Sequence, residues 1–180
     1  SERLERRMSL QPALFGLMVL PFAAVISVWV AISDMSRMKI PNKAVMALFG
    51  VYAVVGLAAV AMSVITLPDY LWRYAHLVVV LIIGFIMNAA GLLGAGDAKF
   101  AAAMAPFIAL GDWPSFAYIF AAAILIGFVL HRIAKSIPPI RRATPTWESW
   151  ERNDFPMGLC LGLAFTTYMV FAALYGGPAS

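Results

Sequence analysis

Long apolar runs separated by short polar segments dominate the chain. A helix needs about 20 mainly apolar residues to cross a hydrocarbon core about 30 Å thick, so the longer runs predict membrane-spanning helices. Backbone polar groups in lipid must be satisfied within the segment, and no run alternates as a transmembrane strand does. The predicted fold is an all-α membrane protein, a bundle of about six transmembrane helices at residues 12–33, 44–66, 75–94, 98–111, 115–131 and 157–175.

The residues around the apolar runs predict where helices continue and where the chain turns. The first follows the basic segment RLERRMSL but continues for 22 residues, longer than a signal-peptide core, so it predicts a retained span. The short fourth and fifth runs are separated by GDWPS, whose Gly and Pro predict a turn. Prolines in the polar segment 131–154 argue against one continuous helix there. A single transmembrane domain over residues 1–180 is expected.

Composition supports a membrane protein. Hydrophobic residues make up 63% of the chain, charged residues 12%, and the mean hydropathy is +0.87. A net charge of +4 would suggest nucleic acid as the partner of a soluble protein, but nine of the thirteen basic residues lie on one predicted side. The positive-inside rule makes that side cytoplasmic, although the basic N-terminal tail argues the other way. The bilayer is therefore the expected partner, and nucleic acid is not. The four other basic residues are Arg3, Arg6, Arg7 and Arg73.

Cysteine and histidine give no sign of a metal site. The single cysteine, Cys160, lies in an apolar run, which excludes a disulfide within the chain and a zinc site of paired cysteines. His76 and His131 fall on opposite predicted sides, which argues against a metal site or a Ser-His pair. We expect no cofactor and no metal.

Two aspartates occupy unusual positions. Asp34 ends the first run and Asp97 follows the third, so two spans separate them and both carboxylates lie on the same side of the membrane. An ionisable side chain at a span edge is costly and suggests a function. Structural alternatives exist: Asp34 can pair with Arg37, and Asp97 can pair with Lys99 or cap the next helix.

The neighbouring residues favour a functional interpretation. In GAGD, Gly94 and Gly96 lack a β-carbon, so an extended substrate can approach the backbone beside the carboxylate. After Asp34, Pro41 stops the helix and Asn42 can cap the next one. Two carboxylates in one dehydrated site provide one acid and one base near neutral pH, which suits activation of water. Paired carboxylates in a membrane also suit a proton-coupled transporter.

The segments DMSRMKIPN and GAGDAKF, two spans apart, resemble the motifs of the type IV prepilin peptidases, which are membrane aspartyl proteases of the GxGD type. The sequences of the two motifs are most similar to those of the branch that serves tight-adherence (Flp) pilus systems. The resemblance implies a catalytic pair at Asp34 and Asp97, with the motif glycines at Gly94 and Gly96. The remaining motif positions, without an assigned role, are Arg37, Pro41, Asn42 and Lys99.

The resemblance also implies a substrate and a place of action. The substrate is a prepilin or pilin-like protein, cut at the cytoplasmic face of the bacterial inner membrane. The alternatives are a GxGD protease that clears signal peptides, or a structural subunit of a pilus secretion system. No oligomeric state is predicted. The segment FPMG before the last run departs from the family's Pro-aromatic-Gly, and we assign that turn no catalytic role.

Overall fold

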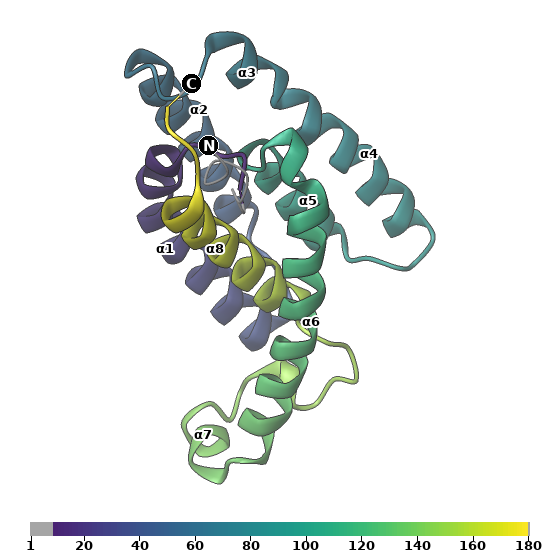
Figure 1. Ribbon diagram of the computed structural model, residues 1–180. Helices are drawn as coiled ribbons and strands as arrows, with labels where there is room; N and C mark the ends of the chain where they lie inside the picture. Colours follow the sequence, from purple (N-terminus) through teal and green to yellow (C-terminus); the bar gives the residue numbers. More distant parts are fainter. Residues whose placement is uncertain (1–8, 180) are drawn as a thin grey trace.

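The computed structural model describes residues 9–179 as an assembly of helices (Figure 1). Five stretches in this part of the chain are long and apolar enough to cross a membrane, which confirms the expected all-α membrane fold. These stretches are Ala13–Arg37, Asn42–Ala61, Leu67–Ala89, Leu110–Ser136 and Met157–Tyr175. The α-helices are α1 Ala13–Arg37, α2 Asn42–Ala61, α3 Leu67–Trp72, α4 Tyr74–Ala89, α5 Ala95–Met104, α6 Trp113–Ser136, α7 Pro138–Ala143 and α8 Met157–Tyr175.

The fourth apolar run crosses the molecule in a different way. Only α5, ten residues long, is an α-helix here, and two 3₁₀ turns, η2 Ala105–Phe107 and η3 Leu110–Asp112, follow it. The segment still reaches the N-terminal end of α1. There the Gln11 side-chain amide donates to the Phe107 carbonyl at 2.8 Å. Most side chains of residues 98–109 are buried. Non-helical backbone is tolerated in a membrane protein where protein surrounds it, so this buried segment needs no full-length helix.

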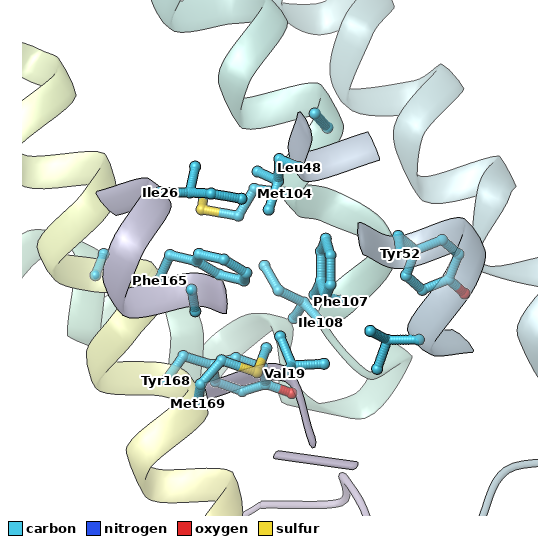
Figure 2. Close-up of a cluster of buried hydrophobic side chains, with 14 of the residues drawn as sticks. Val19, Ile26, Leu48, Tyr52, Met104, Phe107, Ile108, Phe165, Tyr168 and Met169 are labelled. Atoms are coloured by element: carbon cyan, nitrogen blue, oxygen red, sulfur yellow. The ribbon is translucent and has the colours of Figure 1, made fainter. Parts of the chain in front are cut away.

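The core lies where α1, α2 and α8 surround the α5 crossing. Figure 2 shows Phe165 of α8 facing Phe107, with Tyr52 of α2 beyond it. The Phe107 ring packs edge-on against Phe165 and Tyr52, with centroids 5.1 and 5.2 Å apart. Helices α1 and α8 lie side by side along most of their length (Figure 1). This pairing brings the last turns of α1 to the start of α8.

A buried polar cluster holds together the end of the molecule where α1 begins. The Asp112 carboxylate accepts hydrogen bonds from the Ser9 hydroxyl at 2.7 Å, the Leu10 N–H at 2.8 Å and the Tyr168 hydroxyl at 2.8 Å. Each acceptor oxygen of this buried carboxylate therefore has a donor, as burial requires. Residues Arg3, Arg6 and Arg7, used in the orientation argument, lie outside the described residues.

The polar connections follow the sequence pattern. The GDWPS segment forms the η3 turn and the start of α6. The segment 131–154 is broken as its prolines predict: α6 ends at Ser136, α7 follows, and a 3₁₀ turn, η4 Glu148–Trp150, precedes α8. The α1–α2 turn, the α4–α5 loop and the loop before α8 meet around one cavity at one end of the molecule.

Candidate active site

Asp34 lies in the last turn of α1 with its side chain turned into the protein. The residue is only 5% exposed, and its Oδ2 atom accepts a hydrogen bond from the Gly158 N–H at 2.6 Å. Helix α1 ends directly afterwards because Met38 adopts the left-handed conformation, with φ of 50°, and its N–H donates to the Asp34 carbonyl at 2.8 Å. The structural alternative, a pair with Arg37, is wrong, since the Arg37 guanidinium donates to the Ser33 hydroxyl at 3.3 Å instead.

Asp97 is the third residue of α5 rather than its N-cap. Gly94 occupies the N-cap position, and the Gly94 N–H near the Asp97 carboxyl favours its charged form. The proposed pairing with Lys99 is also wrong: within residues 9–179 neither aspartate forms an ion pair. Asp97 lies outside the five long stretches. Burial, and then the charge of Asp34, raise the pKa of Asp97 to about 6, while the Gly94 N–H opposes that shift.

Both aspartates line the same two cavities. The first, of about 490 Å³, lies between α1, the α4–α5 loop and the loop before α8. The second, of about 320 Å³, lies between the α1–α2 turn and the start of α5. The side chains shared by both cavities are those of Asp34, Met38 and Asp97, with Gly94 beside them. The two carboxylates therefore face one polar space from two different helices.

The two motif glycines differ in how closely they approach their neighbours within the chain. A β-carbon on Gly94 would lie 2.6 Å from the Asp97 Oδ2 atom, closer than such contacts occur. A β-carbon on Gly96 would lie 3.4 Å from the Ile40 β-carbon, which is an ordinary contact, so the packing of the α1–α2 turn does not require a glycine there. Gly94 therefore makes room for the Asp97 carboxylate, and the approach of a substrate to both glycines stays a prediction.

Of the other motif residues, Asn42 and Lys99 line this space and Arg37 and Pro41 do not. Within residues 9–179, none of the four forms a hydrogen bond with either carboxylate. Pro41 occupies the N-cap position of α2, and Asn42 is the first helical residue with no capping side-chain bond, so the expected cap at Asn42 is wrong. Asn42 and the exposed Lys99 line the second cavity, together with Lys39. Within residues 9–179, no group of three His, Cys, Asp or Glu side chains is placed to hold a metal ion.

Sequence reasoning missed Gly158. It lies 124 positions from Asp34 and is the second residue of α8, where the first N–H groups of a helix have no partner inside the helix. The segment FPMG contains this glycine, but the replaced aromatic residue leaves the sequence without a reason to assign it a role. A role can be assigned to a glycine at the start of a helix only once the partner of its N–H is known.

These features define a multi-pass membrane protein with a pair of carboxylates in a polar cavity at one end of the helices. Residues 21–131, more than half of the chain, match the family model of the type IV leader peptidase family. The chain belongs to this family, the prepilin peptidases, and is a peptidase. Asp34 and Asp97 lie inside the matched range, and Gly158 lies beyond it. No curated protein and no solved structure matches the chain.

Proposed function

We propose that this protein is an aspartyl endopeptidase that removes the leader from prepilin or pilin-like proteins, using Asp34 and Asp97 to activate water. The observation that carries the proposal is that the two carboxylates, from α1 and α5, line the same two cavities. Both belong to the segment matched by a peptidase family. That match favours peptide hydrolysis over the proton-coupled transporter that the carboxylates alone also suit.

The chemistry follows from a pair that shares one proton. One aspartate, as carboxylate, takes a proton from a water molecule while the water oxygen bonds to the peptide carbonyl carbon. The other, as acid, protonates the carbonyl oxygen. When the tetrahedral intermediate collapses, the carbon–nitrogen bond breaks and a proton passes to the leaving amine. With its pKa raised to about 6, Asp97 can exchange a proton near neutral pH. The proton belongs to the pair, and no covalent intermediate is needed.

The place of the reaction is inferred from the distribution of basic residues and from the sequences of the two motifs. Nine of the thirteen basic residues lie on the side of the cavities, which supports an active site at the cytoplasmic face of the bacterial inner membrane. The KIPN and GAGDAK segments support a place in the short branch that serves tight-adherence pili. The substrate has a short basic leader ahead of an apolar helix.

Co-expression with a candidate prepilin tests this function. We expect Asp34→Asn and Asp97→Asn each to lower the rate of leader removal by about 10²-fold or more, because each removes an acid–base group. Cleavage is followed by gel shift and N-terminal sequencing of the product. Asp69→Asn is the matched control, since the exposed Asp69 carboxylate pairs with the buried Arg73 at 2.8 Å and lies outside both cavities. Full cleavage by either active-site variant would contradict the mechanism.

A further inference from the structure

The start of α8 approaches Asp34 more closely than any residue with a side chain allows. A β-carbon added to Gly158 would lie 2.9 Å from the Asp34 Oδ2 atom, 3.0 Å from its β-carbon and 3.1 Å from its γ-carbon. These contacts involve the carboxyl group and the β-carbon of the Asp34 side chain. The close approach is what brings the Gly158 N–H within 2.6 Å of Oδ2.

The hydrogen bond is directional and buried. A backbone N–H can only donate, so Oδ2 is held as an acceptor and one edge of the Asp34 carboxyl is occupied. In residues 9–179 the second oxygen, Oδ1, receives no hydrogen bond from the protein, and Asp34 lines both cavities. The edge that carries Oδ1 is therefore the one available to water and to Asp97. The orientation of the Asp34 carboxyl depends on where α8 begins.

The α1–α8 contact provides this placement. Gly162, one turn after Gly158 on α8, would bring an added β-carbon 3.0 Å from the Ser27 β-carbon of α1. Small residues of this kind let two membrane helices pack backbone to backbone. Gly162 thus makes a close contact of the same kind on the same pair of helices, but against a serine rather than a carboxylate.

We propose that Gly158 is a positioning residue for the reaction: its N–H and its lack of a side chain hold the Asp34 carboxyl with Oδ1 turned toward the reacting atoms. The proposal rests on the proposed peptidase function. It assigns a role to a residue outside both aspartate motifs and outside the segment matched by the family. Gly158 acts through Asp34, and its own atoms need not touch the substrate.

A kinetic comparison of Gly158→Ala with Gly162→Ala tests the proposal in purified protein and prepilin. We expect Gly158→Ala to lower kcat on the order of 10- to 100-fold with KM within about twofold, because a displaced catalytic group loses rate and not substrate affinity. Gly162→Ala strains the same pair of helices without reaching the carboxyl, so it should lower kcat by a smaller factor than Gly158→Ala does. Gly50→Ala, where an added β-carbon meets no atom within 4 Å, should keep kcat within about twofold. Equal losses of kcat in Gly158→Ala and Gly162→Ala, or a change confined to KM in Gly158→Ala, would overturn the proposal.

Thermal unfolding gives a second readout that needs no substrate. Because Asp34→Ala removes the Oδ2 and γ-carbon contacts and keeps the β-carbon contact, the fall in Tm caused by Gly158→Ala should be smaller when Asp34→Ala is also present. Should Gly158→Ala alone not accumulate as folded protein, recovery of folded protein in the double variant is the expected result. An equal fall in Tm in both backgrounds would overturn the contact. Failure of the intact protein to cut any prepilin would instead overturn the proposed function and leave this Tm result standing.

Discussion

Asp97 is poorly placed for stability, and the residue shows why a reactive position is costly. Burial and the neighbouring charge of Asp34 raise its pKa to about 6, from an ordinary value of 3.8. Between about pH 4 and pH 6 the unfolded chain has released the proton that the folded protein still holds. The free energy of unfolding therefore falls as the pH rises through that window, and the loss is complete above pH 6.

Asp97→Asn is accordingly expected to stabilise the protein while it removes activity. At pH 7 the variant avoids an ionised carboxylate beside Asp34, and we expect a gain of about 1 kcal/mol or more, which is roughly 2–4 °C in Tm for a chain of this size. The gain should shrink toward pH 4. Thermal unfolding in detergent at several pH values measures it.

Asp69→Asn is the control for this stability effect, because it removes a carboxylate that pairs with the buried Arg73 and should not raise Tm. A gain for Asp97→Asn that is the same at pH 4 and pH 7 would show that charge is not its origin. No gain at pH 7 would show that the folded protein does not disfavour the Asp97 carboxylate.

The approach of α4 to α5 is the element contact on which the first cavity depends. Gly84 of α4 faces Ala98 of α5, and a β-carbon there would lie 2.9 Å from the Ala98 β-carbon. Ala98 follows Asp97 directly, and the loop that leads from α4 to Asp97 lines the cavity. Any separation of the two helices therefore moves one of the two carboxylates.

We expect Gly84→Ala to destabilise the protein by about 1–3 kcal/mol, as overpacking of a close contact does, and to lower the rate of leader removal as well. Gly50→Ala is the matched control, because Gly50 lies within α2 and an added β-carbon would meet no atom within 4 Å. This control should be neutral or stabilising by up to about 1 kcal/mol, since alanine is the better helix former. Thermal unfolding and cleavage assays of both variants decide the point, and equal behaviour would contradict it.

Helix ends were predicted less well than helix positions. The run 75–94 continues past the end of α4 at Ala89, because the loop residues Leu92 and Leu93 are as apolar as the helix before them. The run 115–131 stops short of Ser136, because basic residues end an apolar run without ending a helix. Hydropathy reports where a residue partitions, whereas a helix end depends on backbone hydrogen bonds and caps.

The molecule as a whole has one polar end with the two aspartates and another with the Asp112 cluster, and the orientation is a prediction that labelling can test. Cys160 is fully buried, so the protein provides a background free of accessible thiols. Leu92 beside the first cavity is 74% exposed, and Leu110 at the other end is 65% exposed. We expect a membrane-impermeant maleimide to label Leu92→Cys only from the cytoplasmic side and Leu110→Cys only from the opposite side. Inverted and right-side-out vesicles give the two measurements, and the reverse pattern would contradict the assignment.

The order of polar and apolar segments was enough to predict an all-α membrane protein, and two intervening spans were enough to predict that Asp34 and Asp97 share a side. Both conclusions depend on the cost of placing polar groups in lipid, which acts on each segment separately. Only the tertiary structure showed that the fourth apolar run forms a ten-residue helix followed by buried 3₁₀ turns, and that the Gly158 N–H donates to Asp34. Those features arise from packing between residues that are distant in the chain. A buried segment contacts protein and not lipid, and its own sequence does not indicate which residues it will contact.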